Sequence, residues 1–203
     1  MLNSLKKSVR LAAVTAGLVV LGSGLTGCVL APQTIALNDN VALTPATPMV
    51  ARDALVRVVD EREQAPDVIG HRGGRLPENS PLLSERPISD ALSDRLQNSL
   101  KTLGFGSSSP VDPLKVQLAI QQFSFECNEG VIVNECSVRM AFALTILDGA
   151  KTFTKPFKTF ETRSLAASPV AEYNQTWVNE VLDKVWTHMF SDAEVLNALQ
   201  VSQ

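Results

Sequence analysis

The amino-acid sequence predicts an α+β fold, a two-layer sandwich in which two main helices cover one face of a mostly antiparallel sheet. Three observations support this prediction. Residues 54–60 are rich in β-branched side chains, and apolar and polar residues alternate, as in strands, over residues 114–127 and 136–147. Apolar residues recur at helical spacing over residues 87–103 and 168–190. The resulting element order, β-α-β-β-β-α, joins one crossover helix to a three-stranded meander.

The first strand and the first helix each carry local signals of their own. Residues 54–60 are rich in β-branched side chains, which favour a strand. Pro87 suits the first turn of the helix, and Gly104 is placed to end it in the left-handed conformation. The apolar stripe of this helix consists of Ile88, Leu92, Leu96, Leu100 and Leu103.

Residues 114–127 predict a long strand that is interrupted once. Its alternation slips near Gln121 and Gln122, where one extra residue would realign the two apolar halves. We therefore expect a β-bulge at this point.

Two further strands complete the meander. Residues 136–147 alternate without interruption, and the Asp148-Gly149 pair after them is a strong hairpin-turn signal. Residues 151–162 form the last strand of the meander. Because Pro156 has no N–H to donate, we expect this strand at an edge of the sheet.

The last long helix is predicted from its start signals and its wide apolar stripe. Ser168 suits the N-cap, and Pro169 suits the first helical position. The stripe consists of Trp177, Val178, Val181, Leu182, Val185, Trp186, Met189 and Phe190. Residues 192–199 predict a short terminal helix.

The N-terminal 27 residues have the layout of a secretory signal. Three basic side chains precede an apolar run, residues 11–21, that is too short to span a bilayer comfortably. Leu25-Thr26-Gly27-Cys28 then resembles a bacterial lipobox, which implies removal of residues 1–27 and acylation of Cys28, with palmitate among the expected chains. The alternatives are a short transmembrane anchor and a plain signal peptide that leaves Cys28 as a thiol. Val29, in place of aspartate, favours the outer membrane.

The remaining chain is expected to form a tether and one domain. Residues 28–52 are expected to be a lipidated N-terminus and a proline-punctuated tether, although Ile35 and Leu37 would permit a short edge strand. Residues 53–203 are expected to form a single α+β periplasmic domain. Within it, residues 61–86 are polar and contain several glycines and prolines, so we expect a long loop that is less ordered than the sheet.

Two groups of polar residues are candidate binding sites. His71, Arg72, Gly73, Gly74 and Arg75 form a possible anion-binding loop, because successive glycines expose backbone donors beside basic side chains. The alternative is a flexible, solvated loop, since the segment lacks the strand-to-helix context of a phosphate-binding loop.

The second group is a charged pair at the end of the first strand, Asp60 and Arg62. The pair could form a charged site at the edge of the sheet. In the alternative interpretation, Asp60 caps a turn while Arg62 pairs with it or with a loop carbonyl.

Cys127 and Cys136 are expected to form a disulfide at the tip of the central hairpin. Both fall on the inward face of their strands, and an acylated Cys28 would leave an even pair in an oxidising compartment. The alternative is two buried free thiols. Val131, Ile132 and Val133 are unusually apolar for an exposed tip, and we interpret them as a hypothetical partner contact.

Several of these features together resemble the uncharacterised bacterial lipoprotein family typified by YajG. The resemblance rests on the lipobox, the Val56-x-Val58-x-Asp60-x-Arg62 strand end, Ile69-Gly70, the Leu100-x-x-x-Gly104-Phe105 helix end and the long hairpin. It implies an envelope lipoprotein with a helix-on-sheet domain. It provides no catalytic residues, and the two hairpin cysteines look like a local addition.

These observations favour a non-enzymatic binding or scaffolding lipoprotein on the periplasmic face of the outer membrane. The formal net charge of −3 argues against nucleic acid as a partner, and the sequence has no zinc spacing or dinucleotide fingerprint, so we expect no metal or cofactor. The expected partners are the membrane, through the lipid, and another envelope component. One alternative is an auxiliary lipoprotein of lipid or lipopolysaccharide transport, which would need a deep apolar groove. The other is a hydrolase or lyase of cell-wall fragments, which would need a polar cleft at His71.

Overall fold

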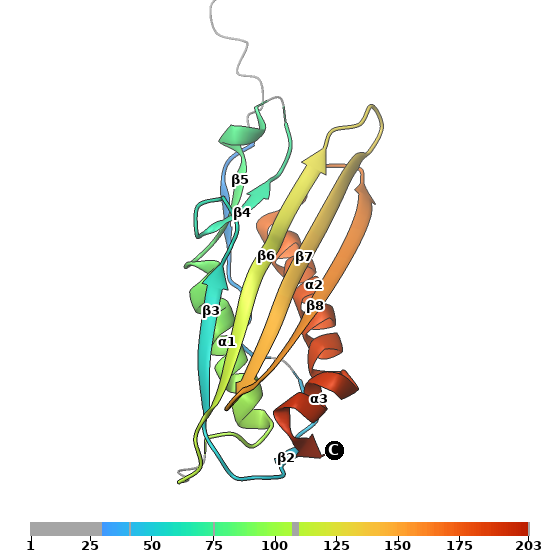
Figure 1. Cartoon of the computed structure of the whole chain (residues 1–203). Coiled ribbons are helices and arrows are strands. Elements are labelled where there is room, and N and C mark those ends of the chain that lie inside the picture. The colour runs from blue at the N-terminus through green and yellow to red at the C-terminus, as the bar shows by residue number, and fades with distance from the viewer. Residues whose placement is uncertain (1–29, 41, 75, 107–109, 203) are drawn as a thin grey trace, which may run out of the picture.

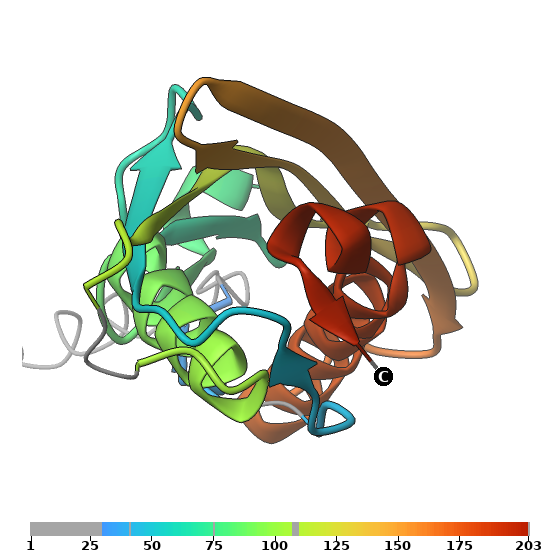
Figure 2. The same cartoon turned by 60° about the horizontal axis from the view of Figure 1, so that its bottom comes forward.

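The structure, a computed structural model, describes residues 30–40, 42–74, 76–106 and 110–202. A seven-stranded sheet carries α1 and α2 on one face (Figure 1). The end-on view in Figure 2 shows that the sheet curves around these helices. The predicted α+β class is confirmed. The predicted order corresponds to β3, α1, β6, β7, β8 and α2, to which the structure adds several short strands. Within the described part of the chain, no helix is long and apolar enough to cross a membrane.

The centre of the sheet is an antiparallel meander of three fifteen-residue strands, β6 (Leu114–Asn128), β7 (Asn134–Asp148) and β8 (Lys151–Leu165). The predicted β-bulge is confirmed, because the β6–β7 register shifts between Ile120 and Gln122. The turn between β7 and β8 is also where the sequence predicted it, with Asp148 opposite Lys151. β8 lies at an edge of the sheet, as Pro156 indicated.

The other edge of β6 pairs with two strands in succession. β3 (Ala54–Asp60) runs parallel to the first half of β6, from Ala54 opposite Leu114 to Asp60 opposite Ile120. β4 (Val68–His71) pairs parallel with the second half, where Gly70 lies opposite Phe125. A Cβ on Gly70 would lie 1.9 Å from the carbonyl oxygen of Phe125, so this close approach requires glycine.

The expectation that residues 61–86 form one long loop is wrong. The segment contains β4, a 3-10 turn (Pro77–Asn79) and β5 (Pro81–Ser84), which pairs antiparallel with β4. Ile69 and Leu82 are fully buried, and they tie these short strands to the core. Strands of four residues are too short to show a clear alternation, which is why the composition suggested a loop.

The described part of residues 28–52 packs against the domain and does not form a tether, and the short edge strand that Ile35 would permit is present. β1 (Gln33–Ile35) pairs parallel with β5, and the side chain of Ile35 is fully buried. β2 (Thr47–Pro48) pairs with β9 (Val201–Ser202) near the C-terminus. The folded domain therefore begins well before residue 53.

Polar side chains on the last long helix explain how this N-terminal segment is held. The Asn179 side chain accepts a hydrogen bond from the Asn38 N–H (2.8 Å) and donates one to the Ala36 carbonyl (2.9 Å). The Gln175 side chain accepts a bond from the Ala36 N–H at 2.9 Å. An extended segment beside a helix has no ladder partner on that side, and these amides satisfy its backbone instead.

The helices agree with the sequence except at one start. α1 (Ile88–Thr102) follows Pro87 directly. Gly104, with φ of 84°, follows the C-terminal end of this helix. α2 (Ala171–Ser191) begins two residues later than predicted, and Ser168 does not cap it. α3 (Ala193–Leu199) is capped by Asp192, whose side chain accepts bonds from two backbone N–H groups of its first turn.

The space between the helices and the sheet is filled by large aromatic side chains. Trp177 and Trp186 of α2 are both fully buried. Their rings meet Phe125 and Phe142 edge-on, with centroid distances of 5.7 and 6.3 Å. Such contacts combine burial of large apolar area with a favourable ring geometry, so α2 is fixed against the centre of the sheet.

Replacement of Gly70 by alanine should separate β4 from β6. Because the added Cβ meets backbone atoms that cannot rotate away, we expect Gly70→Ala to lower the free energy of unfolding by about 2 kcal/mol or more. Urea unfolding followed by tryptophan fluorescence measures this. Gly149→Asn is the control, because a Cβ at that turn meets nothing within 4 Å and asparagine tolerates its φ of 58°. Equal stability of the two variants would contradict the close approach.

Candidate functional site

The outer edge of β3 is one of the edges of the sheet, and it is open to a further strand. The Leu114 N–H donates to the Asp53 carbonyl and the Glu61 N–H donates to the Ile120 carbonyl, both at 3.0 Å. The N–H and C=O of one strand residue point to the same side, so the odd-numbered residues of β3 face β6. Val56 and Val58 therefore direct their backbone groups away from β6, to an edge that pairs with no strand in the described part of the chain.

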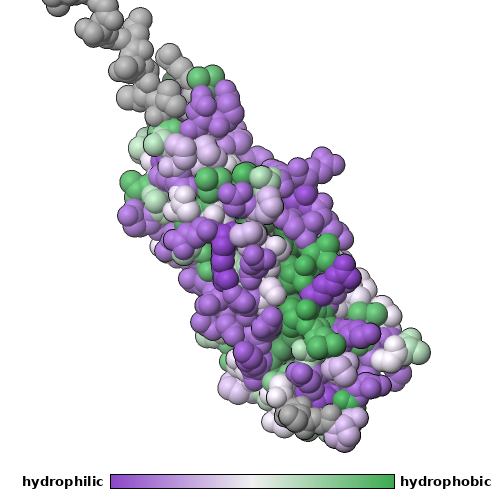
Figure 3. Space-filling model, turned by 90° about the vertical axis from the view of Figure 1, so that its left-hand side faces the viewer, coloured by the Kyte–Doolittle hydropathy of each residue, from purple (hydrophilic) through white to green (hydrophobic). Residues whose placement is uncertain are grey.

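A groove with a volume of about 350 Å³ runs beside this edge, between β3 and α1. Leu55 is half-exposed, and Asp53 and Lys101 are exposed, so the groove combines apolar surface with charges of both signs. Its lining consists of Asp53, Ala54, Leu55, Val56, Gln97, Leu100, Lys101, Phe105 and Gly106. Figure 3 looks onto this side of the molecule, where apolar surface gathers in a strip between hydrophilic margins.

The other edges of the sheet are better protected against pairing than β3. Along β8, Pro156 interrupts the row of backbone N–H donors. The strand also carries four basic side chains, Lys151, Lys155, Lys158 and Arg163. β1 has only three residues, and the chain just after it is bound by α2. β3 has no proline and only one basic residue, Arg57. An apolar, unprotected edge of this kind suits pairing with a partner.

Asp60 and Arg62 form the ion pair that the sequence suggested at the end of β3. Two guanidinium nitrogens of Arg62 donate to the two carboxylate oxygens of Asp60, each at 2.8 Å. Arg62 also donates to the carbonyls of Val68 (2.7 Å) and Phe123 (3.3 Å). The side chain of Arg62 is 4% exposed. It therefore fills the interval between β3 and β4 along the edge of β6, which is a structural role.

The protonation of Asp60 follows from this environment. Burial raises the pKa of its carboxyl group, but the hydrogen bonds and the charge of Arg62 outweigh burial, and the net pKa lies below its ordinary value. A carboxyl with a lowered folded-state pKa contributes stability above its unfolded-state pKa. This contribution is lost as the pH falls through the folded-state pKa, in the acid range below the ordinary value of 3.8.

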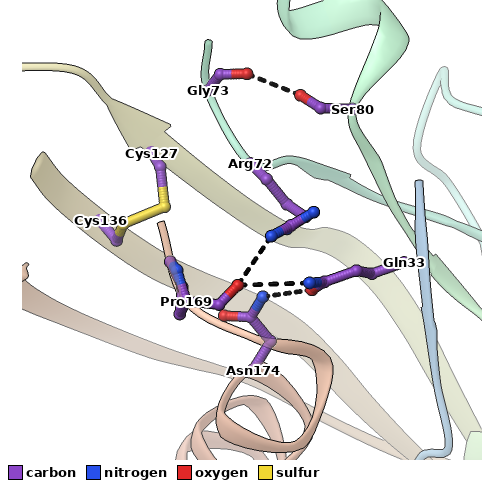
Figure 4. Close-up of a disulfide and its surroundings, with 8 residues drawn as sticks. All are labelled: Gln33, Arg72, Gly73, Ser80, Cys127, Cys136, Pro169 and Asn174. Atoms are coloured by element: carbon purple, nitrogen blue, oxygen red, sulfur yellow. Dashed lines mark hydrogen bonds between the residues drawn. A yellow bond between two sulfur atoms is a disulfide. The ribbon is translucent and has the colours of Figure 1, made fainter. Parts of the chain in front are cut away.

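The suggested anion-binding loop lies beside the hairpin tip, and Figure 4 shows how its Arg72 is used. The buried guanidinium donates to the carbonyls of Ala31 (2.7 Å) and Pro169 (2.8 Å). The Gly73 carbonyl accepts a bond from the Ser80 hydroxyl at 2.6 Å. Arg72 therefore fastens the N-terminal segment to the chain just before α2.

The other residues of that loop are only partly placed. His71 lies in β4 with its Nδ1 atom buried and without a partner among the described residues. A Cβ on Gly73 would lie 2.7 Å from the Cys127 carbonyl oxygen, so this glycine permits a close approach to β6. Gly74 follows it with a positive φ, and Arg75 lies outside the described residues. Anion binding by the loop stays a prediction.

Cys127 and Cys136 form the predicted disulfide (Figure 4). They lie directly opposite each other in the β6–β7 register, and their Cα atoms are 4.0 Å apart. The bridge closes the hairpin tip, where Val131 and Ile132 are almost fully exposed. Cys28, the predicted lipidation site, lies outside the described residues.

Sequence reasoning missed a buried cation that joins both helices to the N-terminal segment. Arg95 of α1 is fully buried, and it donates to Asp183 of α2 (2.6 Å) and to the Asn38 carbonyl (2.9 Å). Its guanidinium also stacks over the Trp186 ring, 5.0 Å from the centroid. The sequence signal that could have indicated its burial is that Arg95 directly precedes Leu96, a member of the apolar stripe of α1.

Removal of the Asp60 carboxylate should leave Arg62 buried without its counter-ion. We expect Asp60→Asn to lower the free energy of unfolding by about 3 kcal/mol at neutral pH, and by less as the pH falls through the folded-state pKa of Asp60. Asp94→Asn is the matched control, because its pair with Arg86 is exposed and should contribute less than about 1 kcal/mol. Urea unfolding at several pH values measures both. If Asp60→Asn lowered the free energy of unfolding as little as Asp94→Asn does, the Asp60–Arg62 pair would not be a main source of stability.

Comparison with known proteins gives a family but no activity. A family model described as "Uncharacterized lipoprotein" matches residues 46–200. No curated protein matches the chain.

Three solved structures resemble this chain at low identity. Protein XCC0632 from Xanthomonas campestris is 12% identical, with a TM-score of 0.46 over 83% of this chain and 95% of that one. An uncharacterised protein is also 12% identical, with a TM-score of 0.45 over 78% and 95% of the two chains. A homologue of the neuraminyllactose-binding hemagglutinin from Helicobacter pylori is 11% identical, with a TM-score of 0.35 over 79% and 95%. The family match covers most of the sequence, and the chain therefore belongs to this family of uncharacterised lipoproteins.

Proposed function

We propose that the protein is a lipoprotein of the outer membrane that scaffolds another envelope component on the periplasmic face. Cys28 carries the lipid, and the domain binds an extended segment of the partner protein along the outer edge of β3. The observation that supports this most directly is the unprotected edge at Val56 and Val58 beside the groove of α1. Lipoprotein-family membership supports the anchor.

The chemistry of the surface suits β-strand addition. Backbone groups of β3 would supply hydrogen bonds to the added strand, and alternate side chains of that strand would enter the groove beside α1. Leu55, Leu100 and Phe105 favour apolar side chains in the added segment. Lys101, which lines the groove, favours a carboxylate in the added segment.

A second copy of the same chain fits this edge poorly. Two β3 edges related by a two-fold axis would pair antiparallel, so the long axes of the two domains would point in opposite directions. The described chain starts at one end of the long axis (Figure 1). Antiparallel copies would therefore direct their two lipid anchors away from each other, which a single membrane does not accommodate. We infer a different protein as the partner.

The packing of the core supports scaffolding over lipid transport. Trp177 and Trp186 occupy the space between the helices and the sheet that a lipid chain would need. The hydrolase or lyase alternative depended on His71 acting with Asp60, Glu61 or Asp67. Within the described ranges no hydrogen bond joins His71 to any of the three, and Asp60 forms its ion pair with Arg62.

The partner should be lost when an outward donor of β3 is removed. Val58→Pro deletes an N–H that points away from β6, so the β3–β6 ladder should survive while strand addition is blocked. Val58→Ala is the matched control, because it trims the same side chain but keeps the N–H.

In-cell photocrosslinking provides the measurement. A photoreactive residue at Leu55 should give one specific product, which persists with Val58→Ala and falls at least about tenfold with Val58→Pro, as loss of about 1.4 kcal/mol would produce. The same residue at Thr187, exposed on α2, should not give that product. Equal products from both positions, or from both Val58 variants, would reject the β3 edge as the binding surface.

The lipid anchor is tested separately with two leader variants. Cys28→Ala should abolish incorporation of labelled palmitate, because it removes the only thiol that the lipobox presents. Val29→Asp should keep the label but, in organisms with an inner-membrane retention signal, move the protein to the inner-membrane fraction of a density gradient. Undiminished labelling of Cys28→Ala would refute acylation at this cysteine.

A further inference from the structure

We propose that Val131, Ile132 and Val133, at the tip of the β6–β7 hairpin, insert into the head-group region of the membrane that holds the lipid anchor. This inference rests on the proposed acylation of Cys28. It assigns a second, non-covalent membrane contact to the protein, made by a surface separate from the β3 edge.

The exposure of the tip is the first observation. Val131, Ile132 and Val133 are 105%, 87% and 43% exposed and stand next to one another in the chain. Single exposed apolar side chains are common on protein surfaces, whereas contiguous ones mark an interaction site. The opposite end of the meander differs, because its turn is made of Gly149 and Ala150.

The second observation is that the chain enters the domain beside this tip. A Cβ on Gly74 would lie 3.7 Å from the side chain of Leu30 and 3.9 Å from the carboxylate of Glu129. Leu30 therefore lies near the base of the hairpin tip. Cys28 precedes Leu30 by two residues, so its Cα is at most about 7 Å from that of Leu30. An anchor this short holds the tip end of the domain at the membrane.

The third observation is that the tip is held in a fixed direction relative to the chain entry. The Cys127–Cys136 disulfide closes the hairpin just below the tip, and Arg72, directly after β4, binds the Ala31 carbonyl. Figure 1 shows the start of the described chain and the β6–β7 tip at the same end of the long axis, with the C-terminus at the other. A domain held by its anchor at this end presents the three apolar side chains to the bilayer.

The anchor explains why so small an apolar surface is enough. Once the acyl chains are in the bilayer, contact of the tip with lipid is intramolecular and has a high effective concentration. The carboxylates of Glu129 and Glu135 flank the tip, so attraction to anionic head groups does not contribute. Insertion should therefore depend on apolar contact, and it should require neither anionic lipid nor low salt.

The test uses the full lipidated chain, purified with its disulfide intact and reconstituted in vesicles of phosphatidylethanolamine and phosphatidylglycerol. An environment-sensitive fluorophore is attached to Ile132→Cys, or to Ala150→Cys at the opposite end as the matched control. We expect a blue shift and an at least twofold rise in emission for the label at position 132, quenched by lipids that carry a quencher in the upper acyl chain. The label at position 150 should report water in the same vesicles.

Flotation of the vesicles separates the possible outcomes. A protein that floats while the label at position 132 reports water would overturn the inference and leave the anchor intact. A protein that does not float would reject the anchor and the inference with it. An emission change that appears only with anionic lipid would overturn apolar insertion. So would a change that disappears in about 0.5 M salt, which screens the attraction between exposed charges. A label that reports water in vesicles but crosslinks to a protein in cells would identify a protein contact instead.

Discussion

The organisation of this domain depends on the need of β6 to satisfy its backbone groups on both edges. β7 covers one edge along the whole strand, whereas the other is divided between β3 and β4. The division falls at the β-bulge near Gln121, where β3 ends and the parallel register cannot continue. Arg62 occupies this interval and donates to the Phe123 carbonyl, which neither short strand reaches. Asp60 in turn neutralises the buried guanidinium, so the ion pair follows from the geometry of the sheet.

The same requirement explains why the N-terminal segment belongs to the fold. β4 needs β5 on its outer side, and β5 in turn pairs with β1. The chain after β1 then lies against α2, where Gln175 and Asn179 satisfy its backbone. Arg72 and Arg95 complete the attachment by binding carbonyls at Ala31 and Asn38. The point at which the chain enters the domain is therefore fixed relative to the sheet, and with it the orientation of the domain toward a lipid anchor.

Sequence reasoning succeeded where a residue acts through its own local chemistry. The slip in alternation located the bulge, Pro156 located an edge strand, and the facing of Cys127 and Cys136 located the disulfide. It allowed the short edge strand at Ile35 but failed for β4 and β5, because strands of four residues are stabilised by distant partners and leave little periodic pattern. The glycines after Ile69 suggested either a possible anion-binding loop or a flexible one, and the structure adds that two of them permit close approach to β6, a contact that the local sequence does not encode.

Two surfaces with different chemistry result from one strand arrangement. The edge of β3 is open because β4 occupies only the tip-proximal half of the β6 edge, which leaves the other half to β3 alone. The hairpin tip lies beyond the last β4–β6 pair, His71 opposite Glu126. If the hairpin tip contacts the membrane, the long axis of β3 points away from the membrane. A partner strand paired with β3 would then run from the membrane into the periplasm, so the lipid contact would set the direction in which the partner is presented.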